Sequence, residues 1–435
     1  MLSRVFRNRD PVMIPPKLPE ESKRAQARGS GGCMVMAGAD RPFGDDPALD
    51  HRVAGRRTVT RRTGLPPLWS VAVVLCGLTF RVPLLAQEPT KGRLLRMVGE
   101  GFRVRETVHF AIAYDTPYET VRPLVGRLEG TYRAVVRLVK RLGLAVEAPK
   151  ERLGVVLFAR YERYAAFLGD GRLAASAAGL YDIERNVAIF CDTLESPTLR
   201  PLVERIDALR HRLRALTTDG AFEPVRARRE ALERALHDLR VKEGVLVERI
   251  NRLVIQHEAA HQILYNLGVH VRGRPNPVVL AEGLACQFEV PQPPTPTGAP
   301  QINGARLGDF REALGVAAGA DSIDEAAYRE AVRSGRYLPL RLLLSDPAAL
   351  DPGGRFAQFR YAQAWALVYD LVRHRPEVLG RCLERIRRRL RENQAVPAMP
   401  ATDLIDCLGV GEAGAERAWV ERMLKLRYDP QEAGR

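Results

Sequence analysis

The segment VIQHEAAHQILYNLG, from Val254 to Gly268, decides how the rest of this sequence is interpreted. It places His257 and His261 four positions apart, with Glu258 directly after the first histidine. On an α-helix, residues four apart share a face, so both imidazoles can reach one metal ion. The surrounding positions, such as Leu264, carry mostly uncharged side chains. This pattern favours a helix buried in a cleft over a solvated helix.

A catalytic zinc site needs a third protein ligand and one open position for water. The spacing of the three-histidine metzincins would put that ligand six residues after His261, where this chain has Leu267. His270 lies too far along for the same spacing and is expected in a loop. Glu282 follows an apolar run and is expected to open a short helix, Glu282–Glu289, with its carboxylate pointing back toward the histidines.

The spacing therefore predicts His257, His261 and Glu282 as ligands of a Zn²⁺ cofactor. Glu258, beside the first ligand, is the expected general base for a water molecule activated by the metal. The competing interpretation, in which the histidines are only core residues without a metal, remains open at this point. H-E-x-x-H patterns also arise by chance, so the third ligand carries most of the weight.

Two residues near the expected third ligand have open roles. Glu289 lies seven positions after Glu282 and can hold the second nitrogen of a ligand histidine, or it is a surface glutamate before Pro291. Cys286, one turn past Glu282, is expected as a small buried apolar residue, with the role of an extra ligand as the alternative.

Three short motifs carry a resemblance to a known superfamily: HEAAHQ at 257–262, VLAEGLACQFE at 279–289 and YAQAWALVYDL at 361–371. They resemble the gluzincins, zinc peptidases with an H-E-x-x-H helix and a downstream glutamate ligand. They are most similar to an uncharacterised family of predicted secreted, gluzincin-like proteins of planctomycete bacteria. The resemblance covers residues 105–380 and implies a zinc-peptidase-like fold.

The resemblance implies His257, His261 and Glu282 as ligands and Glu258 as the base. It also implies that Tyr361 reaches the site and stabilises an oxyanion, although a tyrosine packed in the core fits the sequence equally well. The Gly-x-Met-Glu-Asn segment of the aminopeptidase branch is absent from this chain. An aminopeptidase activity is therefore not expected.

The N-terminal segments predict export. Residues 1–55 are rich in Pro, Gly and charged residues. They are expected to be disordered or to lie upstream of the true start, and Met34 and Met36 are alternative start residues. In residues 56–86, four arginines precede an apolar run that leads to the small Ala86, which is typical of a signal peptide. An uncleaved membrane anchor is the alternative. The expected location is secreted, periplasmic or at the cell envelope.

The fold class expected for the rest of the chain is α+β. Residues 90–195 form an α/β part, in which strands are expected at His109–Asp115 and Arg152–Ala159 and a hairpin around Leu180–Cys191. Residues 196–250 have leucines at heptad spacing and predict a helical hairpin arm with a turn at Asp219-Gly220. Residues 251–302 hold the zinc-site helices and a loop, and residues 303–430 are expected to be helical.

Charge and cysteine content narrow the classes of partner. Of the net charge of +15, +7 belongs to residues 1–86, which hold 14 Lys and Arg against 7 Asp and Glu. The chain has no aromatic-and-basic RNA signature and no zinc-finger spacing, so no nucleic-acid partner is expected. The basic run Arg385–Arg391 is expected on the solvated face of a helix. Four cysteines follow the signal segment, and they pair or stay as buried thiols: Cys191, Cys286, Cys382 and Cys407.

Two functions remain after these observations. The first is a secreted zinc metallopeptidase that hydrolyses a peptide or protein substrate, with the strand hairpin offering an edge to an extended peptide. The alternative is a zinc-stabilised, non-catalytic envelope or interaction protein, in which the arm and the helical C-terminal part are the functional surfaces. The oligomeric state, the substrate and the cleavage specificity have no signal in the sequence.

Overall fold

The computed structural model describes residues 34–36, 72–73, 90–169, 178–216, 223–291, 296–317, 319–346, 348–351, 354–392, 399–411 and 414–428. The fold is α+β, as expected, with one mixed sheet and a mostly helical C-terminal part. The expected leader and signal segments, residues 1–55 and 56–86, lie outside the described residues, apart from two short strands, β1 (Met34–Met36) and β2 (Ala72–Val73). In the described part of the chain, no helix is long and apolar enough to span a membrane.

Five strands form the main part of the sheet: β3 (Arg103–Glu106), β4 (Phe110–Tyr114), β5 (Leu153–Phe158), β6 (Gly179–Asp182) and β7 (Val187–Cys191). Their order is β6-β7-β5-β4-β3, and β1 and β2 continue the sheet beyond β6. β4, β5 and β7 run parallel, whereas β3 and β6 are antiparallel to their neighbours. The expected strands and the β6–β7 hairpin are therefore confirmed.

Both faces of the parallel strands β4, β5 and β7 are buried. Successive side chains along these strands point alternately into two layers of helix. Ile112 and Val155 face α2 (Tyr118–Arg141). Their neighbours in the strands face α1 (Thr90–Val98) and α3 (Tyr161–Leu168) on the other side. A strand buried on both faces reads as a continuous apolar run, and β4 and β5 show such runs. The elements α1 and β3 were not foreseen.

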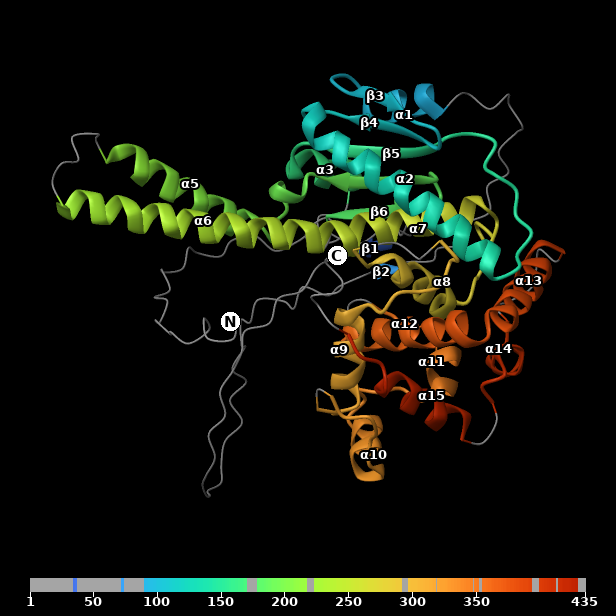
Figure 1. Cartoon of the computed structure of the whole chain (residues 1–435). Coiled ribbons are helices and arrows are strands. Elements are labelled where there is room, and N and C mark those ends of the chain that lie inside the picture. The colour runs from blue at the N-terminus through green and yellow to red at the C-terminus, as the bar shows by residue number, and fades with distance from the viewer. Residues whose placement is uncertain are drawn as a thin grey trace, which may run out of the picture.

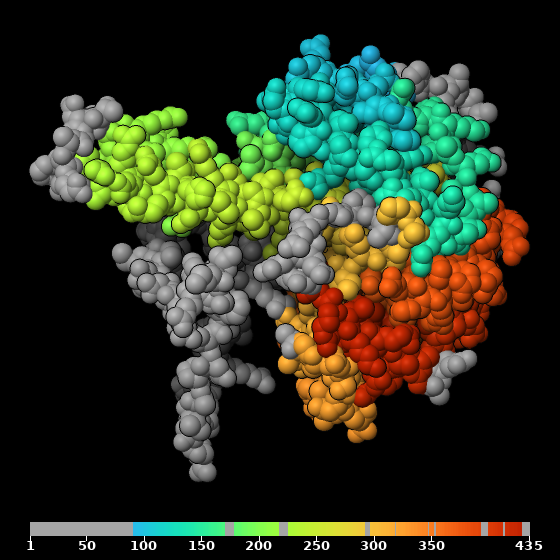
Figure 2. All heavy atoms as spheres, in the orientation of Figure 1, coloured from blue at the N-terminus to red at the C-terminus, as the bar shows by residue number. Residues whose placement is uncertain are grey.

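The expected helical arm consists of α5 (Arg200–Ala215) and α6 (Glu223–Asn251), which pack against each other and project from the body of the molecule (Figures 1 and 2). The expected turn at Asp219-Gly220 lies outside the described residues. A short 3₁₀ turn, η1 (Thr193–Glu195), precedes the arm. α6 runs through Gly244 without a break and changes at η2 (Arg252–Gln256), a π-helical turn that leads directly into α7 (His257–Asn266).

The remaining helices gather below the sheet in Figure 1. They are α8 (Val278–Ala285), η3 (Cys286–Phe288), α9 (Gly304–Ala313), α10 (Glu325–Arg333), α11 (Leu340–Ser345), α12 (Ala357–His374), α13 (Pro376–Glu392), α14 (Ala401–Leu408) and α15 (Ala415–Leu424). α12 is buried along most of its length and packs against α8 and α9.

Three sequence expectations need correction or completion. Glu282 does not open its helix, because α8 begins four residues earlier, directly after Pro277. Tyr361, for which the sequence left a core position or a position at the site open, lies one turn inside α12. The apolar run before Glu282 belongs to α8 itself. The four cysteines after the signal segment are free thiols, of which Cys407 is half-buried and the others are buried.

Candidate metal centre

The two histidines of α7 meet at their Nε2 atoms, which lie 2.9 Å apart. Both side chains are fully buried. The π-helical turn η2 immediately precedes His257 and lets the long arm helix continue into the buried helix while changing its helical phase. Gln256, the last residue of η2, fixes this junction through hydrogen bonds from its Nε2 to the carbonyl oxygens of Phe288 and Val290.

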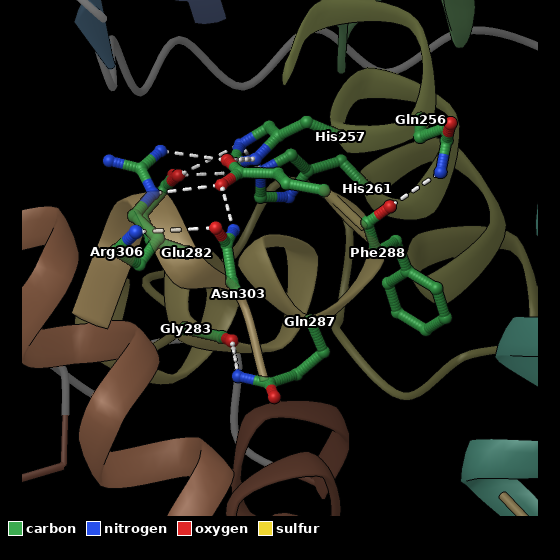
Figure 3. Close-up of polar contacts among 10 residues, drawn as sticks. Gln256, His257, His261, Glu282, Gly283, Gln287, Phe288, Asn303 and Arg306 are labelled. Carbon is green, nitrogen blue, oxygen red and sulfur yellow. Dashed lines mark hydrogen bonds and ion pairs between the residues drawn. The ribbon is translucent and has the colours of Figure 1, made fainter. Parts of the chain in front are cut away.

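Glu282 reaches the histidines from α8, as Figure 3 shows. Its Oε2 lies 3.2 Å from Nε2 of His257 and 3.4 Å from Nε2 of His261. Four ligands at about 2.1 Å around a tetrahedral metal lie roughly 3.4 Å from one another, so this triangle has the right size. The pKa of the Glu282 carboxyl is lowered to about 2, because the two histidines outweigh the opposing effect of burial.

Gly283 explains why α8 comes so close to its neighbour. A β-carbon at this position would lie 2.5 Å from the carbonyl oxygen of Ala364 on α12. Only glycine therefore allows the two helices this contact, which holds Glu282 at the depth of the histidines. The close packing of α8 against α12 thus requires glycine at position 283.

The side chain of Glu258 extends toward β6 of the sheet. Its Oε2 accepts a hydrogen bond of 2.9 Å from the backbone nitrogen of Tyr181 in β6. Its Oε1 has no hydrogen-bond partner among the described residues. Burial raises the pKa of this carboxyl to about 8, against the opposing effect of His257. A positive ion beside it would favour the ionised form. The group is therefore poised for proton transfer near neutral pH.

Glu289 is buried and contacts His257, which excludes the surface position considered for it. Its Oε1 lies 2.9 Å from Nδ1 of His257. A carboxylate at Nδ1 fixes the tautomer of the imidazole and leaves Nε2 free to bind a metal. The structure thus brings all four residues expected around Glu258 into one place: His257, His261, Glu282 and Glu289.

Arg306, on α9, was not foreseen and anchors Glu289. It donates two hydrogen bonds to this carboxylate, from Nε at 2.8 Å and from Nη2 at 2.7 Å. Asn303, at the N-terminal cap of α9, donates a third at 3.1 Å. The guanidinium of Arg306 and His257 lower the pKa of Glu289 to about 2 despite its burial. No signal in the sequence pointed to Arg306, since a long loop separates it from the motif.

Cys286 lies near His257 and Glu289, and these three residues form a second group that could hold a metal ion. This group shares His257 with the group of His257, His261 and Glu282. One ion bound at Nε2 of His257 would therefore have Cys286 as a neutral neighbour. Burial raises the pKa of its thiol to about 11. A thiol is therefore expected there at neutral pH, in agreement with a small buried apolar residue.

Tyr361 also lies at the site, on α12. Its ring packs against Arg306, whose guanidinium carbon is 5.5 Å from the ring centroid. The side chain is only 2% exposed, and its hydroxyl has no hydrogen-bond partner among the described residues. An unpaired buried hydroxyl costs free energy, which a ligand oxygen could recover. The role in oxyanion stabilisation stays a prediction.

His270 follows α7 in the loop where it was expected, but it is buried. Its ring stacks obliquely on Tyr265, with centroids 5.2 Å apart, and its Nε2 has no partner within the described part of the chain. Burial lowers its pKa to about 3, so the imidazole is neutral. The charge of His261 acts in the same direction on this pKa. No spacing rule in the sequence pointed to the burial of His270.

Buried histidine, cysteine and glutamate side chains thus form groups that could hold a metal ion. Two imidazoles and three carboxyl groups gather there with a single guanidinium, that of Arg306, so several buried groups can share the charge of a bound cation. Isolated buried charge is costly, and a divalent cation offsets it. The donor set therefore fits a metal.

Comparison with known proteins gives one finding. Residues 252–391 match the family model described as "Protein of unknown function (DUF1570)". The matched segment contains η2, α7, α8 and α12, and so it includes every residue of the metal centre named above. No curated protein and no solved structure matches the chain.

Proposed function

We propose that this protein is a zinc metallopeptidase of the gluzincin type, secreted or held at the cell envelope. The observation that carries the proposal is the triangle of Nε2 of His257, Nε2 of His261 and Oε2 of Glu282, with sides of 2.9 to 3.4 Å, beside the carboxylate of Glu258. Two imidazoles and one carboxylate are a usual ligand set for catalytic zinc.

Zinc is the metal we propose because of the donor types. Magnesium and calcium prefer six or more oxygen ligands, whereas imidazole nitrogen suits zinc. The three ligand atoms leave room for a fourth, which is the position a catalytic site keeps open. The contact between Glu289 and Nδ1 of His257 also supports zinc, because a carboxylate at the second ring nitrogen commonly orients zinc-binding histidines.

A zinc ion held there supplies Lewis-acid chemistry, which makes a water molecule more acidic and polarises a peptide carbonyl. Glu258 accepts the proton from that water and passes it to the leaving amine. The backbone nitrogen of Tyr181 holds the Glu258 carboxylate in place during this transfer. The hydroxyl of Tyr361, which has no partner among the described residues, donates a hydrogen bond to the carbonyl oxygen as this oxygen gains negative charge.

The substrate we propose is a peptide in extended form, bound along β6. The backbone of β6 contacts the general base directly, through Tyr181. The outer edge of β6 pairs antiparallel with the short strand β1 of the same chain, so this edge accepts an extended segment and the peptide would take the place of β1. Strand addition of this kind gives affinity through main-chain hydrogen bonds.

Glu258→Gln is the decisive test of the proposal. The variant keeps the ligands and removes the base, so it should bind one zinc per chain, by metal analysis, and cleave an unstructured protein at least about 100-fold more slowly. Glu147→Gln, at an exposed position away from the site, is the matched control and should cleave normally. Full activity of Glu258→Gln would refute the mechanism.

A specific observation favours the second function, a non-catalytic zinc-stabilised interaction protein. Glu258 and the three ligands are at most 1% exposed, so a substrate must displace part of the structure to reach them. The arm meanwhile exposes Val241 and Val245 at 55% and 63%. This alternative predicts a bound zinc, no cleavage of a broad peptide library, and partner binding that survives Glu258→Gln.

A further inference from the structure

A polar pocket of about 270 Å³ lies at the edge of the sheet where β5 and β7 begin. Its walls come from α1, from the segment before β5, from the β6–β7 turn, and from the C-terminal end of α7 with the loop after it. The lining residues that matter here are Arg93, Lys150, Arg152, Asn186, Asn266 and Arg272.

The pocket has an excess of positive charge that the protein does not neutralise. Among the described residues, no ion pair involves Arg93, Lys150 or Arg272. Arg152 pairs with Glu106, which lies outside this pocket. The one carboxylate in the lining, Glu151, accepts a hydrogen bond from Thr90 and pairs with none of the four cations. Four unneutralised or weakly paired cations around one cavity create a strongly positive potential.

The floor of the pocket is a rigid polar platform. Asn186 and Asn266 exchange two amide hydrogen bonds, of 3.0 and 2.7 Å. Asn186 holds a left-handed backbone conformation, with φ of 55°, and its Oδ1 also accepts a hydrogen bond from the hydroxyl of Tyr181. Nη2 of Arg272 donates to Oδ1 of Asn266 at 3.4 Å, which orients its guanidinium over the platform.

Arg93 adds a second, independent sign that a ligand belongs here. Its Nε is buried and has no hydrogen-bond partner within the described part of the chain. A buried donor without a partner is unfavourable, and more so when the group is charged. An anion in the pocket would satisfy this donor.

We propose that this pocket is a binding site for an oxyanion, either a carboxylate or a phosphate group. Arginine forks bind both groups in bidentate fashion, and Lys150 adds a mobile point charge. The volume suits one such group with a few attached atoms. The site goes beyond the proposed peptidase function and does not depend on it.

The location links the pocket to the metal centre. Asn266 ends the helix that carries His261, about 7 Å further along its axis. Tyr181 connects the two places, because its backbone nitrogen binds Glu258 and its hydroxyl binds Asn186. An acidic group of a peptide bound along β6 is therefore one source of the anion, and a free phosphate ion is the other.

Titration of the full chain with sodium phosphate at constant ionic strength, followed by calorimetry, tests the site. We expect saturable binding by the native protein, and at least tenfold weaker binding by Arg93→Gln/Arg272→Gln. The control is Arg228→Gln/Arg240→Gln, which removes the same charge from exposed positions on α6 and should leave the affinity unchanged. Lys150→Gln/Arg272→Gln, two exposed positions, replaces the first variant should it not fold.

A pair of peptides that differ only by Glu or Gln at one position separates the two sources. Preference for the Glu peptide, lost in the pocket variant, assigns the anion to a peptide; binding of phosphate alone assigns it to a free ion. Both outcomes support an oxyanion site. The Glu258→Gln protein should give the same binding, because the site does not depend on the peptidase reaction. Equal anion binding by pocket and control variants, or no saturable binding of either ligand, would overturn it.

Discussion

Arg306 is the residue on which the metal centre depends most, although it touches no metal ligand itself. Its two hydrogen bonds hold Glu289, and Glu289 orients His257. Because Arg306 is only 1% exposed, solvent screens its ion pair with Glu289 little. The ion pair between Arg306 on α9 and Glu289 thus helps to fix the orientation of His257 on α7.

Replacing Arg306 should therefore destabilise the fold and weaken metal binding together. Arg306→Met leaves Glu289 buried without its partner, which should cost about 3 to 5 kcal/mol of unfolding free energy. Zinc affinity should fall about 10- to 100-fold, as with other residues that orient ligands. Denaturant melts and competition with a chelating dye measure the two effects.

Arg329→Met is the control, since Arg329 is exposed and pairs with Glu325 within one helix. Its cost should stay below about 1 kcal/mol. An Arg306→Met protein as stable as this control, with unchanged zinc affinity, would contradict the role given to Arg306.

At the scale of elements, the closeness of α8 and α12 decides where Glu282 lies. Gly283→Ala would push a methyl group into the carbonyl of Ala364 and the side chain of Val368, both 2.5 Å from the added β-carbon. We expect a loss of about 1 to 3 kcal/mol in thermal or denaturant unfolding, because neither helix can move without disturbing the core.

Gly308→Ala on α9 is a matched change with the opposite expected sign. Apart from the neighbouring backbone of its own helix, no atom of the described residues lies within 4 Å of the added methyl group. Alanine should stabilise the helix by about 0.5 to 1 kcal/mol. Equal effects of the two substitutions would show that the α8–α12 contact is not tight.

A second element-scale link joins α2 to the turn between β3 and β4. Glu129 accepts hydrogen bonds from the hydroxyl of Thr107 and the backbone nitrogen of His109, and its other oxygen lies 2.6 Å from Nδ1 of His109. Burial opposes ionisation, but these hydrogen bonds outweigh it and lower the pKa of Glu129. A lowered pKa means that folding favours the ionised carboxylate.

The stability from Glu129 should be complete above its unfolded pKa of about 4.3 and lost as the pH falls through the lower folded value. Glu129→Gln should therefore be less stable than the native protein at pH 7, by about 1 kcal/mol. The gap should shrink below pH 4 in denaturant melts. A gap that stays constant between pH 7 and pH 3 would disprove the assignment.

At the scale of the molecule, the metal centre lies between the sheet and the C-terminal helices. α7 packs against α2 and β6, while α8 packs against α12, so a bound ion would join the two layers (Figure 1). A metal ion that binds the folded chain and not the unfolded chain stabilises the fold. Metal binding and global stability should therefore be coupled.

Removing metal with a chelator should lower the melting temperature, and zinc should restore it. Zinc at about 1,000 times its dissociation constant would add roughly 4 kcal/mol of stability. His261→Ala should lose this response, whereas Glu258→Gln should keep it. Identical melting of the native chain with and without zinc, measured by calorimetry, would exclude a metal at this site.

The sequence by itself determined the α+β class, the positions of the main strands, the helical arm and the identity of most residues that meet at the centre. The hydrophobic periodicity and the spacing of His257 and His261 are local features, and local features can be recognised in a single sequence. Only the tertiary structure placed Arg306 on Glu289, buried His270 and assembled the cationic pocket. These contacts join segments that no periodicity relates, because they arise where separate elements pack together.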